Sequence, residues 1–234
     1  METDAGRKGS DLPRVLPCGD TAINVEFSER IDRETNEKVH GLLNNLKVKN
    51  LAGIIAMIPA YRSLLIQYDP CDCSFERLLL AIEECLGEYG VQLSEESEPI
   101  DLPVCYGGEF GADLEEVALF HRMTPERVVE LHSSPVYYVS MIGFTPGFPY
   151  LGGLDERLIT PRKKDPRKKV PAGSIGIADR QTGIYPIESP GGWQLIGRTP
   201  LKLFDLKRAE PFYLKPGDRL RFRPITREEF ENKP

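Results

Sequence analysis

The chain has 234 residues and is acidic, with 36 Asp and Glu against 30 Lys and Arg and a net charge of −6. This balance argues against general nucleic-acid binding, because that affinity comes mainly from cations set against phosphates. Apolar residues make up 40% of the sequence and charged residues 28%, which is ordinary for a soluble globular protein of one or two domains.

The sequence predicts neither a signal peptide nor a membrane-spanning segment. The first residues, METDAGRKGSDLP, contain no apolar run, and no stretch approaches the roughly 20 apolar residues that cross a bilayer. Five cysteines are an odd number, and the pair Cys71-x-Cys73 has no second pair or nearby His to complete a zinc set. We therefore expect a cytoplasmic protein with reduced thiols, no metal site, and neither a membrane nor a nucleic-acid partner.

The first part of the chain predicts an α+β domain over residues 12–93, preceded by a disordered tail over 1–11. The predicted elements are, in chain order, a strand pair within 12–27 that turns at Gly19-Asp20, a helix capped by Asp32, strands at 53–59 and 63–68, and a helix capped by Ser74. Two helices against a small sheet form a layered α+β unit. The polar run at 94–99 is the predicted linker.

Residues 100–226 predict a mainly β domain, followed by a charged tail over 227–234. A strand at 100–104 is followed by a short helix that a capping box of Asp113 and Glu116 would start, and by a second helix with Thr124 at its N-cap that ends near His132. The strands predicted after this point are short, at 136–142, 174–178, 183–187, 193–197 and 219–223. Regularly spaced short strands with Gly and Pro turns indicate a closed or nearly closed β-barrel.

Residues 142–200 hold ten of the 21 glycines and eight of the 20 prolines. Such density is typical of loops, yet five aromatic residues are threaded through it, namely Phe144, Phe148, Tyr150, Tyr185 and Trp193. A linker would not carry these side chains. The segment therefore predicts tight turns that shape a partly apolar cleft with a few polar groups inside.

Three long motifs in this segment resemble the family of bacterial 5-oxoprolinase B subunits, also called allophanate hydrolase subunit 1 or the KipI-type kinase-inhibitor family. The motifs are IGFTPGFPYLGGL at 142–154, PRKKDPRKKVPAGSIGIA at 161–178 and QTGIYPIESPGGWQLIGRTP at 181–200. Weaker agreement at 16–27, 106–118 and 132–139 extends the resemblance over nearly the whole chain. It implies an α+β N-terminal domain followed by a cyclophilin-like barrel.

The resemblance also implies an activity and partners. The B subunit is expected to work with the C and A subunits of 5-oxoprolinase, which together open the lactam of 5-oxoproline to L-glutamate while ATP is hydrolysed to ADP and phosphate. One alternative is a KipI-like binding module that inhibits a sensor histidine kinase, and another is half of a biotin-dependent carboxyltransferase like that of urea amidolyase. The chain has no P-loop motif, so we expect ATP at a site shared with a partner subunit.

Three residues are predicted to be catalytic: Arg162, Arg167 and His132. Opening an amide with ATP needs cations for the phosphates, which the two arginines can supply, although a solvated basic loop is the alternative for the six cations within 162–169. His132 can act as a general base, or it can be a structural residue at a helix C-terminus. No Ser or Cys lies in a nucleophile elbow, so covalent catalysis by this chain alone is not expected.

A larger set is predicted to line the cleft, where polar groups would orient a small carboxylate or amide and aromatic rings would form apolar walls. The set comprises Thr145, Pro146, Gly147, Phe148, Gln181, Thr182, Tyr185, Trp193, Gln194 and Arg198. Barrel core is the alternative for the aromatic residues, and it is the place expected for Phe144.

Overall fold

The computed structural model describes residues 13–87 and 98–232, and the chain forms two compact units, residues 1–95 and 96–234. The tail predicted over 1–11 lies outside the described residues, as does most of the linker predicted at 94–99. No helix within the described ranges is long and apolar enough to cross a membrane.

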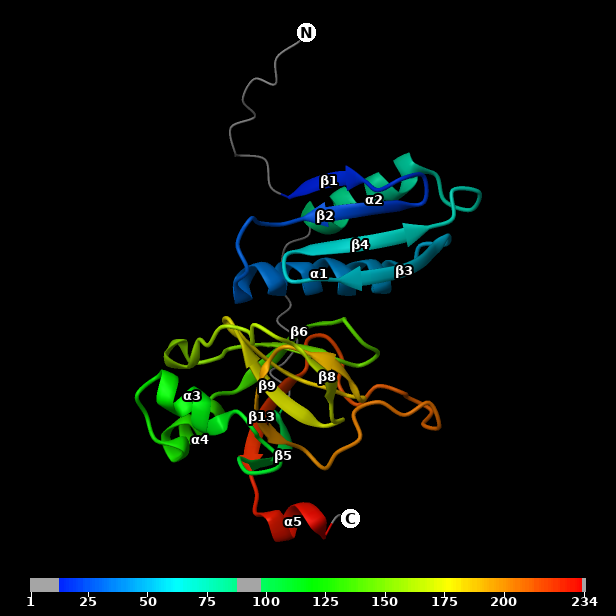
Figure 1. The fold of residues 1–234 in the computed structure, drawn as a ribbon. Helices are drawn as coiled ribbons and strands as arrows, with labels where there is room; N and C mark the ends of the chain where they lie inside the picture. Colours follow the sequence, from blue (N-terminus) through cyan, green and yellow to red (C-terminus); the bar gives the residue numbers. More distant parts are fainter. Residues whose placement is uncertain (1–12, 88–97, 233–234) are drawn as a thin grey trace. The chain divides into compact units, whose positions relative to one another are not determined.

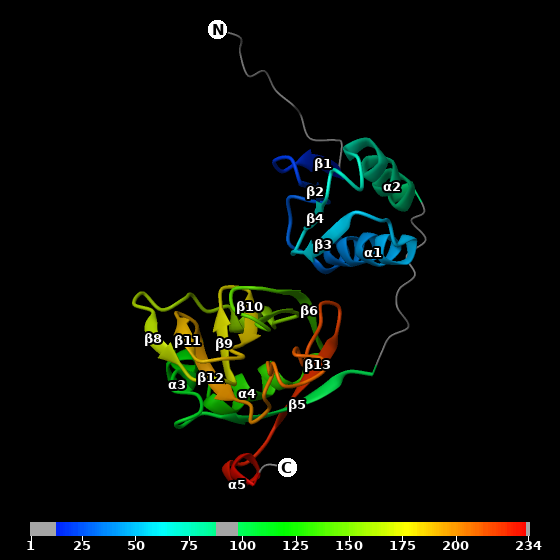
Figure 2. The ribbon, with the colours of Figure 1, turned by 90° about the vertical axis from the view of Figure 1, so that its right-hand side faces the viewer.

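The N-terminal unit is a four-stranded antiparallel sheet in the order β1-β2-β4-β3, with two helices on one face (Figures 1 and 2). Its elements are β1 (Arg14–Pro17), β2 (Ala22–Glu26), α1 (Arg33–Lys49), β3 (Ile54–Pro59), β4 (Ser63–Tyr68) and α2 (Phe75–Gly87). Alternate residues of β2 and β4 are buried against the helices, as the period of a strand requires. Each of the elements predicted here is present, and the Asp32 side chain caps α1 by accepting from the Thr35 N–H at 2.8 Å.

The second unit is built on a closed barrel of seven strands in the order β10-β7-β6-β13-β5-β12-β9, and β9 pairs with β10 to close it. The barrel strands are β5 (Ile100–Tyr106), β6 (Tyr137–Ile142), β7 (Pro149–Gly152), β9 (Ser174–Ala178), β10 (Gln181–Ile184), β12 (Gln194–Arg198) and β13 (Arg219–Pro224). Neighbouring strands are antiparallel except β5 and β13, which are parallel. The predicted fold class, an α+β domain followed by a mainly β barrel, is confirmed.

Two strands of this unit pair outside the barrel, β8 (Arg167–Val170) with β11 (Ser189–Gly191) (Figure 2). Neither was predicted, and nor was β7, because Lys, Pro and Gly conceal the strand pattern in all three. The strand predicted at 183–187 is instead β10, which ends at Ile184. The Tyr185 N–H and C=O then bond the Ser174 C=O and the Gly173 N–H, and Pro186 has no N–H to continue a ladder.

The helices of the second unit are α3 (Leu114–Phe120), α4 (Pro125–Ser133), the 3₁₀ turn η1 (Glu156–Leu158) and α5 (Arg227–Glu231), which lies in the segment predicted as a charged tail. Thr124 caps α4 as predicted, by accepting from the Arg127 N–H. The predicted capping box of α3 is wrong, because the Asp113 side chain makes no capping bond. Asp113 turns instead toward β12 and the segment before β8.

Candidate functional site

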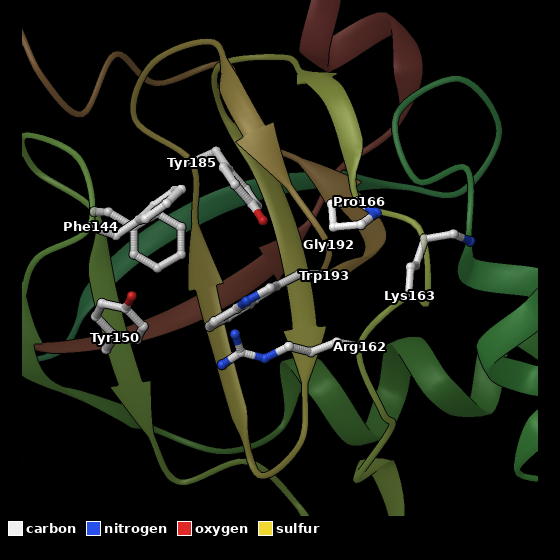
Figure 3. A pocket seen from close by; sticks show the side chains of 9 residues that line it. Phe144, Tyr150, Arg162, Lys163, Pro166, Tyr185, Gly192 and Trp193 are labelled. Atoms are coloured by element: carbon white, nitrogen blue, oxygen red, sulfur yellow. The ribbon is translucent and has the colours of Figure 1, made fainter.

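A pocket of about 170 Å³ opens on the second unit, beside the β8–β11 pair (Figure 3). Four segments that are distant in the sequence meet there: the β6–β7 connection with β7, the segment before β8, the turn after β10, and the link from β11 to β12. The lining residues are Phe144, Phe148, Tyr150, Arg162, Lys163, Pro166, Tyr185, Gly192 and Trp193.

Aromatic rings form the apolar walls of the pocket. Phe148 lies edge-to-face against Tyr185 and Trp193, with ring centroids 5.1 and 5.4 Å apart, and Tyr150 packs 5.9 Å from Trp193. Phe148, Tyr185 and Trp193 are buried, so their rings are held by packing on several sides. The pocket therefore has a fixed, flat-walled interior.

Phe144 stands at the edge of this aromatic group, and the expectation that it belongs to the barrel core is wrong. Its side chain is 63% exposed, and its backbone has a φ of 64°, in the left-handed region that a phenylalanine rarely adopts. Its ring still contacts Phe148 edge-to-face at 5.6 Å. The β6–β7 connection thus presents an aromatic side chain to solvent at the pocket at a backbone cost.

Among the polar groups that line the pocket, Tyr185 and Arg162 are suited to offer a ligand a hydrogen bond and a charge. Burial raises the pKa of the Tyr185 hydroxyl to about 12, so the group stays protonated and can donate. Arg162 is 58% exposed and pairs at 3.3 Å with Asp179, which is 61% exposed. Figure 3 shows the Arg162 guanidinium group close to the Trp193 ring. The pocket thus combines a protonated phenol with a cation whose counter-charge is solvated.

Asp113, which is 1% exposed, fixes two further cations beside the pocket. Its Oδ1 accepts from Lys163 Nζ at 2.8 Å and from Arg167 Nη2 at 2.6 Å, and its Oδ2 accepts from the Leu195 N–H at 2.7 Å. Burial alone would raise the pKa of Asp113, but these hydrogen bonds outweigh it and lower the pKa below its ordinary value. Arg167 itself does not line the pocket, and its Nη1 is buried with no hydrogen-bond partner among the described residues.

His132 lies away from the pocket, in the interior of the second unit, and it is fully buried. Its Nδ1 is 2.8 Å from the Tyr106 hydroxyl, its Nε2 is 2.9 Å from Thr182 Oγ1, and its ring stacks on Phe222 at 4.6 Å. Thr182 Oγ1 donates to the Gly176 C=O, so it must accept from His132 Nε2–H. Burial lowers the pKa of His132 to about 3, and this geometry favours a structural role over that of a general base.

The structure brings four of the predicted site residues to the pocket: Arg162, Phe148, Tyr185 and Trp193. Most of the others are held by the fold itself. Thr182 bonds His132, Gln194 Nε2 donates to the Pro161 C=O, and Arg198 Nε donates to the Ala172 C=O. Outside the pocket lining lie Arg167, His132, Thr145, Pro146, Gly147, Gln181, Thr182, Gln194 and Arg198.

Sequence reasoning did not assign a site role to Tyr150, Lys163, Pro166, Gly192 or Asp113. Lys163, Pro166 and Gly192 are direct neighbours of predicted residues, and Tyr150 lies two positions after Phe148. All four fall in the motifs at 142–154, 161–178 and 181–200, so the motifs themselves were the available signal. Asp113 carried a signal of another kind, a capping pattern that pointed to local structure.

Comparisons with known proteins agree on one family. The model of the carboxyltransferase domain, subdomain C and D, matches residues 13–214. The chain is 42% identical over 227 residues to the 5-oxoprolinase B subunit of Bacillus subtilis (strain 168), covering 93% of this chain and 95% of that one.

Solved structures share the fold. The crystal structure of TTHA0988 has a TM-score of 0.80 at 38% identity, over 87% of this chain and 40% of that chain. The K. lactis urea amidolyase has a TM-score of 0.71 at 25% identity, over 96% of this chain and 16% of that chain. The chain belongs to the carboxyltransferase subdomain C and D family and, within it, to the family of 5-oxoprolinase B subunits.

Proposed function

We propose that this chain is the B subunit of an ATP-dependent 5-oxoprolinase and that its pocket holds 5-oxo-L-proline. The observation that carries the proposal is a small pocket, in a chain of this family, that combines flat aromatic walls with an arginine and a protonated tyrosine. The substrate has matching parts, since it is a five-membered lactam ring with one carboxylate.

Each part of the substrate has a partner of suitable chemistry. The Phe148 and Trp193 rings can pack on the lactam ring and exclude water, and Arg162 can pair with the carboxylate through a charge-assisted hydrogen bond. The Tyr185 hydroxyl can donate to the lactam oxygen, where negative charge grows when the amide is attacked. In this assignment the chain binds and orients the substrate, and the hydroxyl keeps its proton.

The pocket does not fit a whole nucleotide. Sites for drug-sized ligands take roughly 300–1,000 Å³, whereas this pocket has about 170 Å³. ATP carries a purine, a ribose and three phosphates, so we place it at a site shared with a partner subunit, and we assign no phosphoryl-transfer step to residues of this chain. The overall reaction consumes one water for ring opening and one for ATP hydrolysis.

Two exposed aromatic residues support a partner, which we propose to be the C subunit of 5-oxoprolinase, with the A subunit completing the enzyme. Phe144, which lines the pocket, is 63% exposed, and Phe212, which does not, is 42% exposed. A Cβ added to Gly147 would lie 3.3 Å from the Phe212 ring, so the loop that carries Phe144 and Gly147 runs close to Phe212. This chain covers 40% of TTHA0988, so that polypeptide is longer than the part that this chain matches.

Measuring L-glutamate release from 5-oxoproline, with and without ATP, tests the proposal. The chain alone should be nearly inactive, and co-purified B, C and A subunits should release glutamate only with ATP. Arg162→Gln should raise the KM for 5-oxoproline, while Arg180→Gln, which changes an exposed arginine paired with Glu156 outside the pocket lining, should not. No turnover in a folded and assembled complex would refute the proposal and redirect attention to carboxyltransfer or kinase binding.

A further inference from the structure

We infer that Asp113 is a positioning residue for the pocket, which holds the wall formed by Lys163, Pro166 and Trp193 without touching the ligand. The inference rests on the proposed function only for the identity of the ligand. Its physical basis is a single buried carboxylate that joins three distant segments of the chain.

The contacts of Asp113 show how the segments are joined. Lys163 and Arg167, which lie 50 and 54 positions along the chain, both donate to Oδ1. Leu195, 82 positions along, is held by two bonds, because its N–H donates to Oδ2 and its C=O accepts from the Asp113 N–H at 2.8 Å. The start of α3, the segment that leads into the first residue of β8, and the start of β12 therefore meet at one side chain.

Each of these three contacts adjoins a lining residue. Lys163 lines the pocket itself, Arg167 follows the lining residue Pro166, and Leu195 lies two residues after Trp193. Figure 3 shows the Lys163 side chain turned away from the aromatic rings, and its Nζ donates to Asp113, the N-cap residue of α3. Loss of the carboxylate would release the whole wall.

The backbone around Asp113 is also built for this contact. An added Cβ on Gly111 would lie 2.1 Å from the Ile196 C=O, so the loop before α3 approaches β12 as closely as glycine allows. An N-cap side chain usually stabilises its helix by accepting a backbone N–H bond. Asp113 makes no such bond and accepts instead from three distant donors, two of them charged. Helix α3 therefore lacks a side-chain cap, while the Asp113 carboxylate holds distant segments of the chain together.

The network also divides two roles among the cations. Lys163 and Arg167 are bound to a buried carboxylate, whereas Arg162 pairs with an exposed one. Arg162 is therefore the residue that recognises the charge of the ligand, and Asp113 maintains the shape of the pocket wall. Replacing Asp113 should weaken charged and neutral ligands alike, while replacing Arg162 should weaken charged ligands alone.

The single tryptophan of the chain, Trp193, lines the pocket and reports on it directly. We would titrate the full chain with 5-oxo-L-proline and with neutral 2-pyrrolidinone while following Trp193 fluorescence. Asp113→Asn should weaken the binding of both ligands about tenfold, and Arg162→Gln should weaken the binding of 5-oxo-L-proline alone by a similar factor. The loss of one charged hydrogen bond is worth roughly a factor of ten in affinity. Glu116→Gln is the matched control, because Glu116 bonds the same Lys163 at 3.0 Å but is 69% exposed, and it should change neither affinity.

Acrylamide quenching of Trp193 without ligand separates this inference from the proposed function. Asp113→Asn should make the indole clearly more accessible to the quencher. Arg167→Met keeps the Lys163 and Leu195 bonds and should increase the accessibility to a smaller degree. This second variant serves as the test if Asp113→Asn does not fold. If the wild type binds neither 5-oxoproline nor 2-pyrrolidinone, the 5-oxoproline assignment fails, and quenching alone then tests whether Asp113 positions the pocket wall. Unchanged quenching in a folded variant, or tighter binding of the acid by Asp113→Asn, would overturn the inference.

Discussion

Replacing His132 by Gln tests whether this residue is a neutral part of the core. His132 is fully buried, with both ring nitrogens bonded to hydroxyl groups. A glutamine amide also offers an N–H donor and a carbonyl acceptor, but it never takes up a proton in this pH range. The substitution therefore removes a titrating group while keeping a polar side chain at the position.

The size of the effect follows from the pKa of His132, which burial lowers from 6.5 to about 3. In the unfolded chain His132 takes up a proton below pH 6.5, whereas in the folded chain it does not until about pH 3. Between these values the unfolded state binds more protons, so this group makes the folded state less stable as the pH falls, by ~1.4 kcal/mol per pH unit. From pH 6.5 to pH 5 the loss is therefore ~2 kcal/mol.

Urea unfolding at pH 7 and pH 5, followed through Trp193 fluorescence, measures the effect in the unit that contains His132. The wild type should lose ~2 kcal/mol more of unfolding free energy than His132→Gln over this range. His121→Gln is the control, because burial lowers the pKa of partly exposed His121 in the same direction, and we expect a smaller difference. Parallel pH dependence of wild type and His132→Gln would refute the reasoning, and a folded variant that assembles but loses turnover would restore His132 as a catalytic base.

Three further substitutions test the pocket. Arg162→Gln should weaken 5-oxoproline binding about tenfold without lowering the melting temperature, because the exposed pair of Arg162 with Asp179 contributes little to folding. Fluorescence titration measures the affinity, and a thermal scan measures the melting temperature. Gly191→Ala places a methyl group 2.3 Å from the Tyr185 hydroxyl and should cost about 1–3 kcal/mol in urea unfolding, whereas Gly192→Ala, whose nearest atom is 3.5 Å away, should cost less. Phe144→Gly relieves the left-handed backbone and should change stability by less than ~1 kcal/mol, yet reduce co-elution with the partner subunit in gel filtration.

The elements that could be predicted are those whose pattern is complete within a short window. The Asp32 cap and the apolar residues at helical spacing predict helix α1. Short apolar segments predict β2 and β4, whose residues are alternately buried in the structure. Strand β8 reads Arg-Lys-Lys-Val and β11 reads Ser-Pro-Gly, so neither has such a pattern. They are strands because they pair with each other across about twenty residues, which no local window contains.

The candidate site also has a part that the sequence could predict, its aromatic residues, and a part that it could not, its polar residues. Aromatic residues in a Gly- and Pro-rich segment predicted an apolar pocket, and Phe148, Tyr185 and Trp193 do line one. The polar residues of that segment could not be sorted by type, because a threonine or glutamine serves a backbone carbonyl as readily as a ligand. Thr182 and Gln194 serve carbonyls in this structure, those of Gly176 and Pro161.

The basic run at 162–169 shows why the number of cations in a sequence does not give the number that can bind a ligand. Displacing Asp113 from both Lys163 and Arg167 would leave a buried carboxylate with the Leu195 N–H but without a cation, and breaking a buried ion pair costs about 3–5 kcal/mol. Displacing Asp179 from Arg162 costs about 0–1 kcal/mol, because both groups are exposed. A substrate carboxylate can therefore compete for Arg162 and cannot compete for the other two, although the three stand within six positions of each other in the sequence.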